Sequence, residues 1–124
     1  MMNIQRFAAA TGKVESIKGK ILGLESKLVA VTSDGIVFDV KNCSNDRICI
    51  VFKNTHATVA KDVKVLKPTT GGYAAASSDL VLDDLAAAGG VAAVWVETAA
   101  YANADGTIVC TGESTDVKAV CLYW

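Results

Sequence analysis

The chain has a single histidine, a single proline and no strong excess of either charge, and each scarcity narrows the functional classes open to it. His56 lies in the predicted turn KNTHATVAK, and a histidine that catalyses or binds metal needs partner side chains, which this turn does not supply. We therefore interpret His56 as a solvated loop residue. The formal net charge is −1, with Lys and Arg scattered along the chain. No basic field would attract nucleic acid or an anionic membrane.

Long apolar runs are also missing. None reaches the roughly 18 residues that a membrane span requires. The opening MMNIQRFAAATG has one Arg and a short apolar patch, without the apolar core of a signal peptide. We expect a protein made in a cytoplasm and not secreted by that route.

The four cysteines lack the spacing of a metal site, since they form no Cys-x-x-Cys pair. Cys49, Cys110 and Cys121 fall within strand patterns, where a free cysteine behaves as a small apolar residue. We interpret the cysteines as structural thiols, reduced in a cytoplasm. A disulfide between Cys110 and Cys121 across a C-terminal hairpin, and a metal site, are the alternatives.

Other catalytic patterns are absent as well. Asp83 and Asp84 are adjacent, so on a strand their carboxylates point to opposite faces. Gly12-Lys13 and Gly71-Gly72 lack the rest of a phosphate-binding loop. We predict no catalytic residue, no metal ligand and no cofactor, and thus a protein that is not an enzyme.

What the chain does contain is apolar sequence suited to one folded domain. Hydrophobic residues make up 52% of its 124 residues and charged residues 20%, which excludes a disordered chain. Residues 1–27 form an irregular arm, with Ile4 and Phe7 as isolated anchors. Apolar spacings of three and four favour a weak helix there, whereas three glycines favour an extended arm. The arm packs on its own domain or on a neighbouring subunit, and we expect deletion of residues 1–20 to leave the domain folded but to weaken assembly.

From Leu28 to Trp124 the apolar period changes to two, which is typical of strands. An Asp34-Gly35 turn between Leu28–Thr32 and Ile36–Val40 predicts a β-hairpin. The run Arg47–Asn54 is apolar on both faces, which predicts a central strand. Further strands are predicted at Asp62–Pro68, Leu80–Asp83, Val91–Thr98, Thr107–Thr111 and Val117–Trp124, the last two as a pair. Within Leu80–Gly90 a helical turn or two is the alternative to the strand.

Seven to eight short strands at this spacing, without helices between them, are typical of an all-β fold. We predict an antiparallel β-sandwich or a jelly-roll-like barrel over residues 28–124, with the extended arm in front of it.

The aromatic residues are the candidates for an interface. Trp95 is mid-strand on the face of Val91 and Ala93, and we predict that it belongs to the core, with a place at an interface as the alternative. Tyr123 and Trp124 end the chain and must pack on their own domain or on a partner, because aromatic side chains are costly to leave in water. The candidate interface residues are Ile4, Phe7, Tyr73, Tyr101, Tyr123 and Trp124.

The order of segments from about residue 36 to 122 matches a pattern of strands and turns. Its pieces are Phe52-Lys53-Asn54, Lys61–Val65, Asp79-Leu80, Ala88-Gly89, Glu97, Tyr101, Asp105-Gly106, Thr115-Asp116-Val117 and Ala119-Val120. In this pattern the chain resembles the capsid decoration (cement) proteins of tailed bacteriophages. The opening MMNIQRFA is similar to the start of many phage virion proteins. The segment ETAAY departs from the pattern, because it replaces a basic residue often present there.

The resemblance implies a β-sandwich that binds the outer surface of an assembled phage head and stabilises it without catalysis. It implies the major capsid protein as partner, a homo-oligomer such as a dimer or trimer, and a place on the virion after synthesis in the host cytoplasm. The alternatives are another virion component with a sandwich fold, such as a tail tube, connector or head fibre, and a carbohydrate- or surface-binding module. In that module Tyr73, Trp95 and Tyr101 would be stacking platforms.

Overall fold

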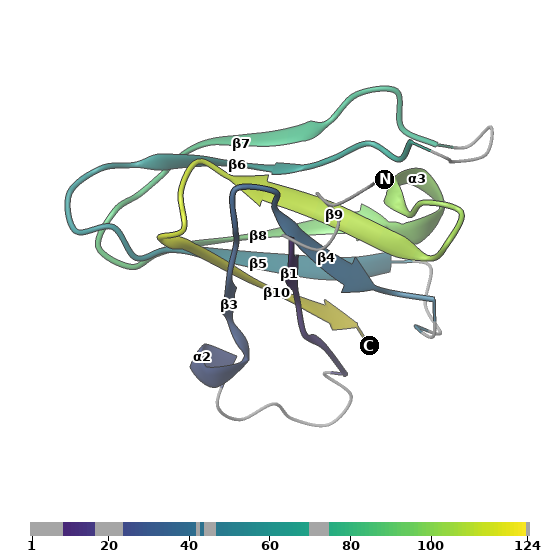
Figure 1. Cartoon of the computed structure of the whole chain (residues 1–124), viewed down its shortest axis with the longest axis horizontal. Coiled ribbons are helices and arrows are strands. Elements are labelled where there is room, and N and C mark those ends of the chain that lie inside the picture. The colour runs from purple at the N-terminus through teal and green to yellow at the C-terminus, as the bar shows by residue number, and fades with distance from the viewer. Residues whose placement is uncertain (1–8, 17–23, 42, 44–46, 70–74, 124) are drawn as a thin grey trace, which may run out of the picture.

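The computed structural model describes residues 9–16, 24–41, 43, 47–69 and 75–123. Strands predominate in these ranges, which confirms the prediction of a mostly β protein (Figure 1). The strands are β1 (Ala10–Thr11), β2 (Val14–Ser16), β3 (Val29–Ala30), β4 (Ile36–Asp39), β5 (Arg47–Asn54), β6 (Lys61–Val65), β7 (Leu80–Leu85), β8 (Gly90–Glu97), β9 (Thr107–Gly112) and β10 (Val117–Tyr123). The helices are the single turns α2 (Leu24–Lys27) and α3 (Thr98–Tyr101). Neither of them is long and apolar enough to cross a membrane.

The strands form two sheets, which do not close into a barrel within the described ranges. Sheet A has the order β1-β4-β9-β6-β7, and sheet B has the order β2-β10-β5-β8. Strand β5 occupies one side of β10 along its whole length, so β2 and β3 follow each other along the other side. Both sheets are mixed, because β1 runs parallel to β4 and β2 runs parallel to β10. The prediction of purely antiparallel sheets was therefore wrong at these two edges, where strands of two and three residues are too short to show a period.

One apolar cluster joins the two sheets. Phe38 and Ile108 of sheet A pack in the same cluster as Ile50 and Phe52 of sheet B, and all four are fully buried. Strand β5 is flanked by β8 and β10, which confirms the prediction of a central strand. Its opposite face is nearly buried too, because Cys49 forms a second cluster with neighbouring apolar residues of sheet B.

Residues 10–16 of the N-terminal segment connect the two sheets. Strand β1 pairs with β4 in sheet A, and β2, three residues later, pairs with β10 in sheet B. Gly12 lies at this crossing, where its N–H donates to the Val37 carbonyl at 2.9 Å. A side chain at Gly12 would overlap the ring of Phe38, so the crossing requires glycine.

The predicted hairpin around Asp34-Gly35 is wrong in its pairing. A turn does form, since Gly35 has a φ of +99° and its N–H donates to the Thr32 carbonyl at 2.9 Å. The bridge between Thr32 and Gly35 is isolated, however, and β3 pairs with β10 while β4 pairs with β9. The turn therefore transfers the chain from sheet B to sheet A.

The predicted pairing of the last two strands is also wrong. Strand β9 lies between β4 and β6 in sheet A, whereas β10 belongs to sheet B. Both strands place alternate apolar residues in the shared core, among them Ile108 and Ala119. Each strand faces the core from its own sheet, and the linker between them crosses from one sheet to the other.

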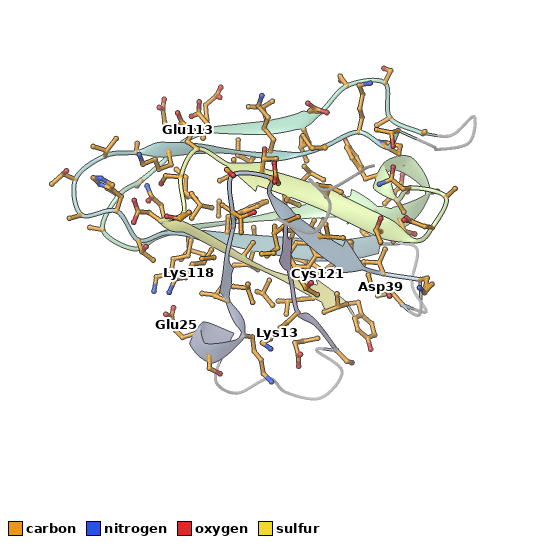
Figure 2. All side chains as sticks on the ribbon, viewed as in Figure 1. Lys13, Glu25, Asp39, Glu113, Lys118 and Cys121 are labelled. Carbon is orange, nitrogen blue, oxygen red and sulfur yellow. The ribbon has the colours of Figure 1, made fainter. Side chains whose placement is uncertain are left out.

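Helix α2 is tied to the outer face of sheet B. The Lys53 ammonium of β5 binds both carboxylate oxygens of Glu25 at 2.7 and 2.8 Å. Lys118 of β10 is the cross-strand neighbour of Lys53, and Figure 2 shows Glu25 and Lys118 on the same side of the molecule. A second ion pair joins Lys27 to Glu15 at 3.7 Å.

Candidate interaction surface

Three of the cysteines, Cys49, Cys110 and Cys121, are buried thiols, and Cys43 is half-buried. All four are free, and burial raises the pKa of Cys121 to about 12. Burial, with a smaller contribution from Cys121, raises the pKa of the Cys110 thiol still further. Burial also raises the pKa of Cys43 and of Cys49. A protonated thiol is a poor nucleophile and metal ligand, so these side chains act as apolar packing groups.

His56 organises a turn instead of facing solvent freely. Its Nδ1 accepts the backbone N–H of Thr58 at 3.1 Å and of Val59 at 3.0 Å. Its carbonyl accepts the N–H of Ala88 from the β7–β8 turn at 2.7 Å. The imidazole therefore holds its own turn together, and the backbone carbonyl of His56 joins that turn to the β7–β8 turn.

Asn54 joins these turns from inside and is the one fully buried polar residue in the described ranges. Its Nδ2 donates to the carbonyls of Val59 at 3.0 Å and Leu85 at 2.9 Å. Its Oδ1 accepts the His56 N–H at 3.0 Å. The sequence placed Asn54 at a strand end but did not reveal this role, since an asparagine there is also typical of an exposed turn.

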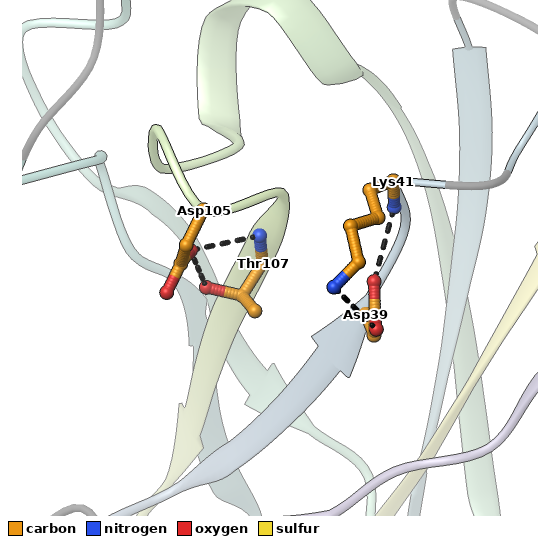
Figure 3. Close-up of polar contacts among 4 residues, drawn as sticks. All are labelled: Asp39, Lys41, Asp105 and Thr107. Carbon is orange, nitrogen blue, oxygen red and sulfur yellow. Dashed lines mark hydrogen bonds and ion pairs between the residues drawn. The ribbon is translucent and has the colours of Figure 1, made fainter.

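Two aspartates stabilise the neighbouring ends of β4 and β9 (Figure 3). Asp39 accepts the Lys41 N–H at 3.1 Å and pairs with the Lys41 ammonium at 3.3 Å. These contacts hold the pKa of the Asp39 carboxyl below its usual value, the backbone hydrogen bond first. Asp105 accepts the Thr107 hydroxyl at 2.6 Å and the Thr107 N–H at 3.2 Å. Each carboxylate therefore stabilises the turn in which it lies.

No group of three or more metal-ligating side chains occurs among the residues that the structure describes. The adjacent Asp83 and Asp84 are both exposed, and Asp84 has a φ of +58°. The Asp84 N–H donates to the Asp62 carboxylate at 2.8 Å, which ties β7 to β6.

The six predicted interface residues divide into two groups. Ile4, Phe7, Tyr73 and Trp124 lie outside the described residues. Tyr101 at the end of α3 and Tyr123 at the end of β10 are half-buried and pack against the core of their own chain. Their contact with a second molecule stays a prediction.

The prediction that Trp95 belongs to the core was wrong. Val91, Ala93 and Trp95 do share one face of β8, but this face points outward, and Val91 is 60% and Trp95 58% exposed. We call these three residues the β8 strip. Both faces of β8 are apolar, so alternation alone does not tell them apart. The usable signal was Glu97, the charged residue on the same face as Trp95.

The side of the molecule between the two sheets extends this apolar surface. A shallow groove separates β7 from β8, and Val81 on β7 is 44% exposed. The groove is lined by Val81, Leu82, Asp83, Asp84, Leu85, Ala86, Gly90, Val91 and Ala92. Edge strands of both sheets therefore carry exposed valines.

A separate hollow of about 400 Å³ lies over sheet A. We call this cavity the sheet A hollow. The side chains of Val37, Leu66 and Val109 form its apolar walls. Its polar part includes Lys67 and Asn103, whose amide accepts the Thr69 N–H and hydroxyl and donates to the Thr107 carbonyl. Hydrogen bonds of the Asn103 side chain thus hold one rim of the hollow in place.

No protein-family model matches the chain, and searches of curated proteins and of solved structures return no significant match.

Proposed function

We propose that this chain is a non-enzymatic structural protein of a tailed-bacteriophage head. In this role it decorates the outer surface of the assembled capsid, binds the major capsid protein there and stabilises the shell. We also propose that its two sheets form a β-sandwich, because one cluster contains buried residues of both sheets.

Two separate segments that carry the sequence resemblance are hydrogen-bonded to each other, and this observation carries the proposal. Phe52-Lys53-Asn54 ends β5, and Ala88-Gly89 lies more than thirty residues later in the β7–β8 turn. The Gly89 N–H donates to the Asn54 carbonyl at 2.8 Å, and the Ala88 N–H donates to the carbonyl of His56, two residues after Asn54. The two pieces therefore belong to one hydrogen-bonded unit of this fold, as we expect if the segments that carry the resemblance have a structural role.

The sheet A hollow is the surface that we assign to the capsid. Residues 24–28 pack over part of the outer face of sheet B, whereas the sheet A hollow combines apolar walls with an exposed lysine. Specific protein interfaces bury roughly 1,600 Å² and carry an apolar centre with a polar rim. Many copies on one shell would gain further from multivalency.

The test is co-sedimentation with expanded phage heads that lack the protein. Wild-type protein should pellet with these heads, and Val109→Lys should bind roughly tenfold more weakly or worse, because it introduces a charge among the apolar walls. Val59→Lys is the matched control, since Val59 is 48% exposed and lies in the β5–β6 connection, outside the hollow.

Circular dichroism of both variants checks that they are folded. If the wild type pellets with neither heads nor any other virion component, the proposed function is wrong. If Val59→Lys loses binding as strongly as Val109→Lys, the assignment to the hollow is wrong.

A further inference from the structure

Strand β8 is an edge strand of sheet B, and among the described residues it pairs with β5 alone. It has eight residues, no proline and no lysine, and its one charged residue, Glu97, is its last. Natural proteins usually protect such edges with charged residues, proline or a bulge, because a free strand edge binds further strands.

Strand β7, the edge of sheet A on the other side of the groove from β8, has this protection. Strand β7 carries the exposed carboxylates of Asp83 and Asp84, and its register with β6 shifts between Lys61 and Val63. A bulge of this kind twists an edge away from straight pairing. The two edges lie at the same groove, so the contrast singles out β8.

The outward face of β8 is apolar as well. Val91 and Trp95 are more than half exposed, with the small side chain of Ala93 between them. The apolar surface continues across β5 through Cys49, which lies opposite Trp95 and is nearly buried. An exposed apolar strip beside a free strand edge is suited to a partner that offers the same two features.

We propose that β8 pairs antiparallel with β8 of a second copy of this chain, about a two-fold axis at Ala93. Sheet B then continues across the interface as one sheet. This inference goes beyond capsid binding and does not depend on it.

Side-chain size and charge select this register. With Ala93 opposite Ala93 of the second copy, each Val91 faces a Trp95, and each Glu97 faces a Gly89. A Cβ at Gly89 would lie 3.7 Å from Cε of Lys53, so the Glu97 carboxylate of one copy comes close to the Lys53 ammonium of the other, beside the Glu25 carboxylate that this ammonium already binds. A register centred on Val94 instead places the Glu97 carboxylate opposite the apolar Val91. Because the interface is two-fold, the contact of Val91 with Trp95 and that of Glu97 with Lys53 each occur twice, and the contact on the axis at Ala93 occurs once.

Sedimentation equilibrium of the full chain tests the interface. Wild-type protein should form a dimer, and Trp95→Asp should weaken the dimer by roughly 100-fold or more, because two buried tryptophans are lost per dimer. The matched control is Val59→Asp, which places the same charge on another exposed apolar residue and should dimerise like the wild type. A wild type that stays monomeric overturns the inference, and so does a dimer that Trp95→Asp leaves intact.

Cross-linking tests the register, with Cys43→Ser as background, because Cys43 is the one half-buried cysteine. Ala93→Cys should form a covalent dimer under mild oxidation, since residues opposite each other on paired strands bring their Cβ atoms within about 5 Å. Val91→Cys on the same exposed strip is the control, because it faces Trp95 and not its own copy. Failure of Ala93→Cys, or faster cross-linking by Val91→Cys, overturns the proposed pairing.

Two other occupants of the β8 strip give distinct results. A glycan array signal that Trp95→Ala abolishes would identify a carbohydrate ligand and overturn the inference. Binding to empty phage heads that Trp95→Asp abolishes, with a monomeric wild type in solution, would also overturn it. Loss of head binding through Val109→Lys alone concerns only the proposed function, so the two failures can be told apart.

Discussion

Asn54 occupies a core position that an apolar residue would usually fill, and its three side-chain hydrogen bonds join separate turns. Burying an amide without hydrogen-bond partners lowers the stability of the fold, and its hydrogen bonds do little more than offset that loss. What the residue adds is specificity, because the bonds define how the β5–β6 connection sits on the end of β7. Sequence alone could not show this, since the partner Leu85 lies 31 positions away.

The first prediction concerns Asn54→Leu. Leucine has a similar volume but leaves the Leu85 and Val59 carbonyls without their donor, so we expect the free energy of unfolding to fall by about 2–4 kcal/mol. Urea unfolding followed by tryptophan fluorescence measures this change. Asn103→Leu is the control, because the Asn103 amide also accepts and donates hydrogen bonds but its oxygen accepts at an exposed site. This variant should lose about 1 kcal/mol in the free energy of unfolding. Equal losses in both variants would contradict the special role of Asn54.

The second prediction concerns the pH dependence that Asp39 adds. Its folded pKa is lower than its unfolded value because of the Lys41 contacts. Such a carboxyl contributes stability that is fully present above the unfolded pKa of about 3.9 and is lost as the pH falls through the folded pKa. Wild type should therefore lose more stability than Asp39→Asn when the pH falls from about 5 to below 3.

Urea midpoints over this pH range measure the difference, and carboxyl titration by NMR gives the pKa of Asp39 directly. The effect is small, because Asp39 is exposed and solvent screens its charge. Parallel pH profiles for wild type and Asp39→Asn would show that the Lys41 contacts do not stabilise the fold.

At the scale of elements, the strands could be predicted and their partners could not. Runs such as Arg47–Asn54 carry their own alternation, and β5 has these same bounds. Pairing depends on residues far away in the sequence, so the Asp34-Gly35 turn predicted a hairpin where the chain changes sheets. The prediction that Trp95 is buried failed for a related reason. Strand β8 is apolar on both faces, and Trp95 is exposed because of the place of β8 at the edge of sheet B.

The third prediction concerns Gly35→Val in the turn between β3 and β4. The φ of +99° is strained for any side chain, and a Cβ there would lie 2.5 Å from the Cys110 carbonyl oxygen of β9. We expect a loss of about 3 kcal/mol or more in the free energy of unfolding, because strain and overlap add. Asp34→Val at the exposed neighbouring position is the control and should change stability by less than about 1 kcal/mol. A stable Gly35→Val protein would show that the turn can change its conformation.

At the scale of the whole molecule, residues 10–16 join the edges of both sheets. Strand β1 extends sheet A and β2 extends sheet B, while Ala10 and Val14 pack against the shared core. The Lys13 carbonyl also accepts the Cys121 N–H of β10 at 3.1 Å. The sequence hid this role, because two strands of two and three residues show neither a period of two nor a helical stripe.

The fourth prediction concerns a chain that begins at residue 17. Without β1 and β2, the ring of Phe38 loses the backbone of Gly12 that lies against it, and the edges of β4 and β10 lose their parallel partners. Burying one apolar side chain contributes about 1.5–3 kcal/mol, so with two half-buried side chains removed we expect stability to fall by about 2 kcal/mol or more. The expectation from sequence was that a chain without residues 1–20 stays folded, and the structure adds a loss of stability to it. Urea unfolding measures the loss.

Gly12→Val in the full-length chain is the companion variant, since it disturbs the crossing through overlap with Phe38 and removes no residue. If residues 10–16 hold the two sheets together, both changes should lower the urea midpoint. Each should leave dimerisation through β8 in place at low urea, because β8 is at the opposite edge of sheet B from β2. A truncated chain as stable as the wild type would show that the N-terminal strands cover the sheet edges without stabilising the fold.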